Sequence, residues 1–346
     1  MSETRDPRPR RRRLLRAVVG LLVLLAVIGY FAVQRDSNGG GGAPFCVAGA
    51  DPIGAEETSA TYEMSPEQAA NAATIAAVGV AKGLPDRAVT IALATAMQES
   101  ALRNLDHGDR DSLGLFQQRP SMGWGTPAQI TDPVYSAAIF YDHLVDVPGY
   151  SRLPLTVAAQ KVQRSGFPQA YAKHEPDATV LTAAFAGGGT LNCGGPAPAG
   201  PGDPARVQAD LIRIFGKDGT HTMSSQAGQD GQAGQDGQAG QDGQAGQDGQ
   251  AGEAGRNSDG GSGAPEAEVR LVEKKNGGEE ATRHSRAMAH WAVAHAKTMG
   301  ISRVSYGRHG WVGGKDRGRW QDKGGAGGKD AAHYAGPGEV RIFMAR

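Results

Sequence analysis

Residues 85–101 read PDRAVTIALATAMQESA, and this stretch decides the fold of the central part of the chain. Its apolar residues recur at intervals of three and four, the spacing that brings side chains onto one face of an α-helix. These residues are Val89, Leu93, Ala96 and Met97. Glu99 lies near the end of the segment. The spacing therefore predicts an amphipathic helix whose last turn carries a carboxylate.

Further helices are expected on both sides of this segment. Ser65-Pro66-Glu67-Gln68 is typical of a helix N-terminus, because Ser65 and Gln68 can form a capping box and proline fits the first turn. Similar starts are expected at Asp132, Thr156, Asp177 and Asp203. Residues 61–216 are thus long enough to form a mainly α-helical domain with its own core.

Glycine and proline limit how much of the chain can be compact. The 346 residues include 52 Gly and 19 Pro, about a fifth of the chain against a usual share of about 12%. From Gln226 the unit Gln-Ala-Gly-Gln-Asp-Gly repeats four times. This composition excludes one compact globule of the full length. It predicts a tether over residues 34–60 and a low-complexity linker over residues 217–264.

The charges are balanced overall but not along the chain. Lys+Arg and Asp+Glu number 36 each, yet residues 1–16 hold seven arginines and only two acidic residues. Residues 17–33 are uncharged and apolar, and their roughly 25 Å of helix just spans a bilayer core. They are predicted to be an uncleaved transmembrane anchor, with residues 1–16 cytoplasmic and the bulk of the chain outside. A cleaved signal peptide is the alternative interpretation.

Only two cysteines are present, Cys46 and Cys193. Oxidation is permitted outside the membrane, and the two residues flank the helical segment. A single disulfide between them is predicted, with two unpaired thiols as the alternative.

The last 80 or so residues regain a regular pattern. Alternation over residues 267–271 and 340–344 predicts strands, and residues 281–299 predict a helix. Residues 265–346 are therefore expected to form a small basic α/β module. Twelve Lys+Arg against four acidic residues in 281–346, with three tryptophans, favour an anionic wall polymer or anionic lipid head groups as its partner. Nucleic acid is not expected in that compartment, and a merely soluble basic domain is the alternative.

Glu99 is the leading candidate for catalysis. Exposed carbonyls at a helix C-terminus make that site electronegative, which disfavours the ionised carboxylate. Burial among Ala96, Met97 and Leu102 would add to the effect. A carboxyl group kept protonated near neutral pH can act as a general acid. The alternative is a solvent-facing glutamate at a helix end.

A second motif follows Glu99 along the chain. Glu99-Ser100 is followed by Gly114-Leu115-Phe116-Gln117 and then by Pro120. Over roughly residues 65–190 this arrangement resembles the lytic transglycosylases and goose-type lysozymes. The resemblance implies a lysozyme-like fold that acts on peptidoglycan, with Glu99 as the catalytic acid and with Ser100 and Gln117 at the substrate cleft. Phe116 stands where the family usually has methionine.

The family's late Ala-Tyr-Asn-Ala-Gly motif is the main departure from this pattern. Ala184-Phe185-Ala186-Gly187 is the nearest match, but it lacks both the tyrosine hydroxyl and the asparagine. Residues 162–168 are a candidate substitute, in which Gln163 would supply polar contacts to the substrate. Trp124 is a candidate for stacking on a sugar face, with a core role as the alternative. Weaker candidates for the same cleft are Arg119 and Tyr171.

Two mechanisms fit a glutamic acid in this position. A hydrolase needs a second carboxylate, for which the loop offers Asp106, Asp109 and Asp111. A transglycosylase needs none, because the substrate's own acetamido and 6-hydroxyl groups complete the reaction. The transglycosylase is preferred, since none of the three aspartates is compelling. No cofactor or metal is expected, as the aspartate spacing lacks the ligand pattern of a calcium loop.

The sequence as a whole predicts a membrane-anchored, extracytoplasmic enzyme that cleaves the glycan strands of peptidoglycan. Its fold class is expected to be a mainly α lysozyme-like domain after an N-terminal transmembrane helix, followed by the small C-terminal α/β module. The main alternative is a non-catalytic envelope protein that binds peptidoglycan through the same domain. A structural envelope protein with a Gly/Gln-rich spacer is a third interpretation.

Overall fold

The computed structural model describes residues 44–53, 55, 60–165, 169–217, 221–224, 267–272, 278–322, 335–336 and 338–346. The predicted cytoplasmic tail (1–16) and membrane anchor (17–33) lie outside these residues, as do much of the predicted tether and most of the linker. Within the described ranges, no helix is both long enough and apolar enough to cross a membrane.

Helices dominate the first part of the described chain. The longer ones are α2 (Pro66–Ala81), α3 (Asp86–Ser100), α5 (Pro133–Val145), α6 (Leu155–Gln163), α7 (Glu175–Phe185) and α8 (Pro204–Phe215). The shorter ones are α4 (Pro127–Ile130) and the 3-10 turns η1 (Pro120–Met122), η2 (Tyr150–Arg152) and η3 (Ala172–His174). Ser65, Asp132 and Asp203 cap α2, α5 and α8 as predicted. Helices α6 and α7 begin slightly earlier than predicted, after Pro154 and His174.

Two antiparallel sheets accompany the helices. Strands β1 (Phe45–Gly49), β2 (Thr61–Met64) and β3 (Thr190–Gly194) form a three-stranded sheet in the order β2-β1-β3. The second sheet has six strands in the order β4-β5-β9-β6-β7-β8. Its strands are β4 (His221–Ser224), β5 (Glu268–Val272), β6 (Ile301–Tyr306), β7 (His309–Val312), β8 (Gln321–Asp322) and β9 (Glu339–Met344). Between β5 and β6 lie α9 (Glu279–Ala294) and α10 (Ala296–Met299), and the turn η4 (Asp316–Gly318) precedes β8.

The predicted fold class is therefore wrong. The described chain is mixed α/β, with two antiparallel sheets beside its helices, and not a mainly α domain followed by a small module. Strand β1 falls within the predicted tether, and β3 follows the glycine run at 187–189, where the sequence pattern predicts no strand. Their pairing joins residues about 145 positions apart, and such long-range register is not visible in a local hydrophobic pattern.

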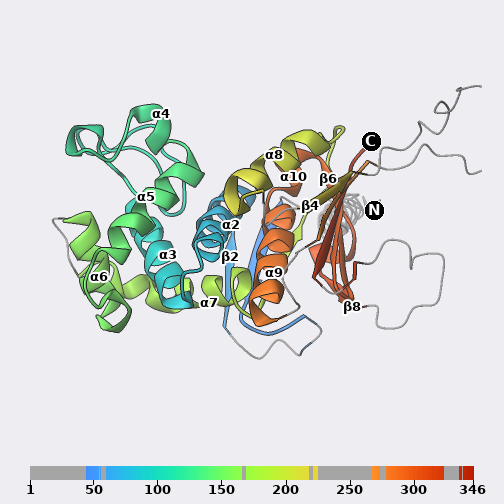
Figure 1. Cartoon of the computed structure of the whole chain (residues 1–346), viewed down its shortest axis with the longest axis horizontal. Helices are drawn as coiled ribbons and strands as arrows, with labels where there is room; N and C mark the ends of the chain where they lie inside the picture. Colours follow the sequence, from blue (N-terminus) through green and yellow to red (C-terminus); the bar gives the residue numbers. More distant parts are fainter. Residues whose placement is uncertain are drawn as a thin grey trace, which may run out of the picture.

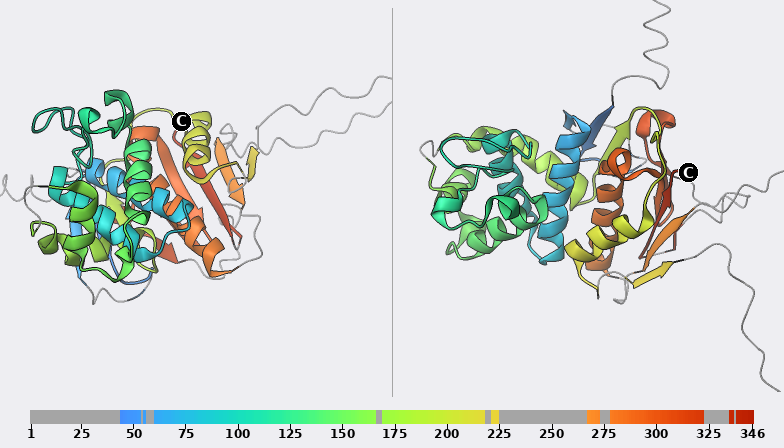
Figure 2. Two further views of the ribbon diagram at one scale, coloured as in Figure 1. Left: turned by 60° about the vertical axis from the view of Figure 1, so that its left-hand side comes forward. Right: turned by 90° about the horizontal axis from the view of Figure 1, so that it is seen from above.

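Helix α9 joins the two parts of the molecule. It packs against α2 on one side and against strands β6 and β9 on the other, as Figures 1 and 2 show. Buried apolar residues from α2, α3, α9 and the six-stranded sheet belong to one continuous core. Trp291, Trp311 and Trp320 are all buried in it, so these three aromatic rings pack inside the protein and not on a binding face.

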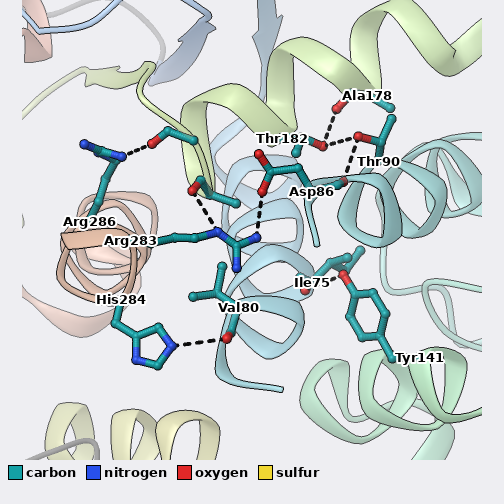
Figure 3. A network of polar contacts seen from close by, with 12 residues as sticks. Ile75, Val80, Asp86, Thr90, Tyr141, Ala178, Thr182, Arg283, His284 and Arg286 are labelled. Atoms are coloured by element: carbon teal, nitrogen blue, oxygen red, sulfur yellow. Dashed lines mark hydrogen bonds and ion pairs between the residues drawn. The ribbon is translucent and has the colours of Figure 1, made fainter. Parts of the chain in front are cut away.

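Polar contacts tie α9 to the carbonyl groups that end α2 and α7 (Figure 3). Arg283 donates to the Ala186 carbonyl at 3.2 Å and forms an ion pair with Asp86 at 2.7 Å. His284 contacts the Val80 carbonyl at 3.2 Å, and Arg286 donates to the Gly187 carbonyl. Two arginines of the C-terminal region thus make contacts within the protein and do not contribute to an open basic surface.

The predicted disulfide is confirmed. Cys46 on β1 and Cys193 on β3 are opposite each other in the antiparallel register and are covalently joined. The bond closes a separation of 147 residues. It therefore holds the first strand of the three-stranded sheet to the last across the whole helical segment.

Replacing Cys46 by alanine should lower the free energy of unfolding by as much as about 5 kcal/mol. The disulfide restricts the unfolded chain, and removing the restriction on so long a loop raises the entropy of the unfolded state. The measurement is urea unfolding of both proteins with and without a reductant. Reductant should shift the midpoint of the wild type toward that of Cys46→Ala and leave the variant unchanged. A wild-type midpoint that ignores the reductant would contradict the stabilising role.

Acid should destabilise the contact between α7 and α9. His290 is fully buried on α9, and its Nδ1 lies 2.6 Å from the Ala184 carbonyl. Burial lowers the pKa of His290 to about 3. In the unfolded chain the imidazole takes up a proton near pH 6.5, whereas the folded protein keeps it neutral down to about pH 3. The free energy of unfolding that depends on neutral His290 is therefore fully present above about pH 6.5 and is lost as the pH falls toward 3.

Between pH 7 and pH 5, the loss from His290 alone should be about 2 kcal/mol in the free energy of unfolding. His290→Asn cannot titrate in this range and should show a correspondingly smaller decline in urea midpoints measured at the two pH values. His107→Asn is the control, since His107 is exposed and should decline like the wild type. Equal declines in all three proteins would refute the role of His290.

Candidate active site

Glu99 is the last but one residue of α3, and the chain leaves that helix through a left-handed turn. Ala101 and Leu102 have φ values of 51° and 61°. Two side chains of α2 hold this turn: Gln68 donates to the Ala101 carbonyl at 2.9 Å, and Asn71 donates to the Leu102 carbonyl at 2.8 Å. The backbone next to Glu99 is therefore fixed by the neighbouring helix.

The carboxyl group of Glu99 is enclosed by two polar side chains from a different part of the chain. The Tyr171 hydroxyl donates to Glu99 Oε1 at 2.5 Å, and the Gln163 amide also hydrogen-bonds this carboxyl group. Burial raises the pKa of Glu99, and this effect outweighs the two hydrogen bonds, which favour the ionised form. The result is a carboxyl group that stays protonated to higher pH than an ordinary glutamate.

Glu99 lies in a cleft with a volume of about 810 Å³. The walls come from the segment before η1, from the end of α5 and from the end of α6. Figure 1 shows α5 and α6 at the end of the molecule opposite the six-stranded sheet. The lining residues used below are Glu99, Asp109, Arg110, Gln117, Arg119, Trp124, His143, Asp146, Lys161, Gln163 and Arg164.

Gln163 and Gln117, both predicted at the substrate cleft, do line it. Gln163 Nε2 lies 2.7 Å from the Phe116 carbonyl, so this side chain connects α6 to the Gly114–Gln117 segment. Gln117 has a left-handed backbone, with φ of 47°, and its amide is 3.3 Å from the carbonyls of His107 and Gly114.

Trp124 also lines the cleft. Its ring centre is 4.5 Å from that of His143, at an interplanar angle of 55°. Tyr135 donates to the Trp124 carbonyl at 3.2 Å, which fixes the backbone of this loop. Trp124 is partly exposed, so one part of the indole supports the loop while another remains accessible from the cleft.

Ser100 is placed differently from the prediction that it contacts substrate. It is buried and is not among the lining residues. Its hydroxyl is shared between the Ala96 carbonyl at 3.0 Å and the Leu115 carbonyl at 2.8 Å. Ser100 thus ties the end of α3 to the loop that carries Gln117.

The three loop aspartates do not gather around Glu99. Asp106 is exposed, contacts His107 and is not part of the cleft lining. Asp109 lines the cleft but is exposed. Hydrogen bonds from Ser121 and Arg119 hold the pKa of Asp111 well below its usual range, so this group stays ionised and paired. No group of three or more His, Cys, Asp or Glu suited to a metal ion occurs among the described residues.

Tyr171 carries more of the site than the sequence indicated. Its side chain is fully buried, and it reaches Glu99 from the turn between α6 and α7. Ala170-Tyr171 begins like the late Ala-Tyr-Asn-Ala-Gly motif, and this dipeptide was the available signal. The segment Ala184–Gly187, which matches the late motif best by sequence, lies at the contact with α9 and not at Glu99. His143, Asp146, Lys161 and Arg164 are further lining residues that no motif marked.

Neither protein-family models nor curated proteins contain a match to this chain.

Tyr171→Phe should raise the pKa of Glu99 further, because it removes a hydrogen bond that favours the ionised carboxylate. Carbon NMR titration of glutamate side chains measures this directly, with Glu99→Gln to assign the signal. Tyr150→Phe is the matched control, since Tyr150 is not among the cleft-lining residues. An unchanged or lower pKa in Tyr171→Phe would show that the contact does not stabilise the carboxylate.

Proposed function

We propose that this protein cleaves the glycan strands of peptidoglycan, with Glu99 as general acid and then general base. One observation carries the proposal: the only lining carboxyl group withdrawn from solvent, within the described part of the chain, is Glu99. Its raised pKa suits proton donation to a leaving oxygen near neutral pH. The Glu99–Gln117 spacing that resembles lytic transglycosylases and goose-type lysozymes supports the same chemistry.

The first step breaks a glycosidic bond. The Glu99 carboxyl proton passes to the bridging oxygen while the bond from that oxygen to the anomeric carbon breaks, and the sugar ring develops oxocarbenium character. The leaving strand departs as a neutral alcohol, and Glu99 becomes a carboxylate. Hydrogen bonds from Tyr171 and Gln163 stabilise that carboxylate at the moment it forms.

The carboxylates favour a transglycosylase over a hydrolase. In a transglycosylase the substrate's 6-hydroxyl attacks the anomeric carbon, Glu99 takes the hydroxyl proton, and a 1,6-anhydro sugar results. A hydrolase needs a second carboxylate to activate water or to form a covalent intermediate. Asp111 is ion-paired with Arg119, and the remaining lining carboxylates, Asp109 and Asp146, are both exposed.

We place this activity outside the cytoplasm. The Cys46–Cys193 disulfide supports an oxidising compartment, because such bonds rarely persist in the cytosol. The membrane anchor at residues 17–33 lies outside the described residues and stays a prediction. Attraction of the basic C-terminal region to an anionic wall polymer or lipid head groups likewise stays a prediction.

The test is to incubate the purified full chain with peptidoglycan and to identify the released fragments by mass spectrometry. The wild type should release anhydro-muropeptides, and Glu99→Gln should be slower by about 10²- to 10⁴-fold, the usual contribution of a general acid. Asp106→Asn is the matched carboxyl-to-amide control and should retain the wild-type rate, because Asp106 lies outside the cleft lining.

Each alternative has a distinct result in this experiment. Reducing ends in place of anhydro sugars would mean hydrolysis and would direct attention to Asp109 and Asp146. Binding to peptidoglycan without release of fragments would establish the non-catalytic alternative. Wild-type rates in Glu99→Gln would reject Glu99 as the acid.

A further inference from the structure

Some of the positively charged side chains in the cleft are paired with carboxylates and others are not. Arg119 is ion-paired with Asp111 at 2.7 Å, and Arg110 approaches Asp109 at 4.0 Å. Lys161 and Arg164 also line the cleft and are exposed. Among the described residues, no carboxylate oxygen lies within 4.0 Å of the charged nitrogens of Lys161 or Arg164, the distance that defines an ion pair. These two cations are therefore available to a ligand.

Both residues belong to a segment that the fold holds in place. Val162, between Lys161 and Gln163, is buried in the core. Arg164 ends α6 with a left-handed φ of 52°, and its amide donates to the Gln160 carbonyl at 2.8 Å. The Gln160 side chain in turn donates to the Ser165 carbonyl at 2.7 Å. The backbone carrying the two cations is thus preorganised, which lowers the entropic cost of binding.

The backbone that carries this pair is also adjacent to a side chain that contacts Glu99. Gln163 lies between Lys161 and Arg164 in the chain and hydrogen-bonds the carboxyl group of Glu99. Lys161, Arg164 and Glu99 also line the same cleft, so an anionic group bound by the two cations would share that cleft with the bond that Glu99 protonates. Apart from Glu99, the described lining has two carboxylates, of which Asp109 faces Arg110 and Asp146 has no ion pair. Arg119 is paired with Asp111, so Lys161 and Arg164 leave the lining with an excess of positive charge.

We infer that Lys161 and Arg164 form a carboxylate-binding subsite that selects glycan strands with acidic substituents beside the scissile bond. This inference rests on the proposed function and deepens it. Peptidoglycan carries carboxylates on its peptide stems, whereas a polymer of N-acetylglucosamine is neutral. The guanidinium fork of Arg164 matches a carboxylate, and Lys161 adds a point charge.

The test measures binding separately from cleavage, using the full chain with Glu99→Gln as the parent. Three probes are compared by calorimetry at low salt: acidic peptidoglycan fragments, the same fragments with their carboxylates converted to methylamides, and chitohexaose. Lys161→Gln/Arg164→Gln removes both charges from the subsite. Arg152→Gln/Lys217→Gln removes two charges from outside the cleft lining and is the matched control.

The subsite variant should bind the acidic fragments about fivefold to tenfold more weakly than the parent, the effect expected for two partly exposed charges. Its affinity for the amidated fragments and for chitohexaose should change by less than about twofold, and the salt dependence of acidic-fragment binding should decrease. The control should behave like the parent. The variant Lys161→Gln/Arg164→Lys restores one positive charge but not the guanidinium group. It should recover part of the affinity for the acidic fragments.

Other results separate this inference from the proposed function. Equal affinity of the subsite variant and its parent for acidic fragments would overturn the inference, as would an equal loss for all three probes. If the wild type cleaves peptidoglycan while no preference for carboxylates exists, only the inference fails. If no cleavage occurs but the preference exists and depends on Lys161 and Arg164, the subsite stands and the catalytic proposal fails.

Discussion

The second half of helix α2 is buried on every side, and the surrounding elements are arranged to cover it. An unbroken run from Ala72 to Val80 is buried, and most of its side chains are alanine or valine. A helical segment that is apolar all round has to be covered by other elements of a protein in water. Small side chains also let neighbouring helices approach closely. Helices α3, α5 and α8 cover part of α2, and α9 covers another part.

This requirement explains why the C-terminal region is part of the same core. Without α9, the buried face of α2 would be exposed, and Val80, Ala186 and Gly187 would lose the side chains that contact their carbonyls. The six-stranded sheet then covers the opposite side of α9. A region that follows a long Gly/Gln-rich stretch in sequence is thus structurally continuous with the first helices.

Helix α2 also positions the backbone of the candidate active site. Gln68 and Asn71 of α2 hold the carbonyls of Ala101 and Leu102, which fixes the chain just after Glu99. Tyr171 and Gln163 hydrogen-bond the carboxyl group itself. Because the supporting groups are in place before a substrate arrives, little reorganisation is needed when the carboxylate forms. The raised pKa of Glu99 follows from its burial, which outweighs the two hydrogen bonds.

The sequence by itself determined the local features: the capping box of α2, the aspartate caps of α5 and α8, the helical phase of α3, and the one disulfide that two cysteines allow. These depend on contacts between residues close in the chain or on simple counting. The tertiary structure alone decided the pairing of β1 with β3, the burial of α9 against α2, and the approach of Tyr171 to Glu99 across 72 positions. Such contacts depend on how several elements pack at once, and no local spacing of residues encodes that arrangement.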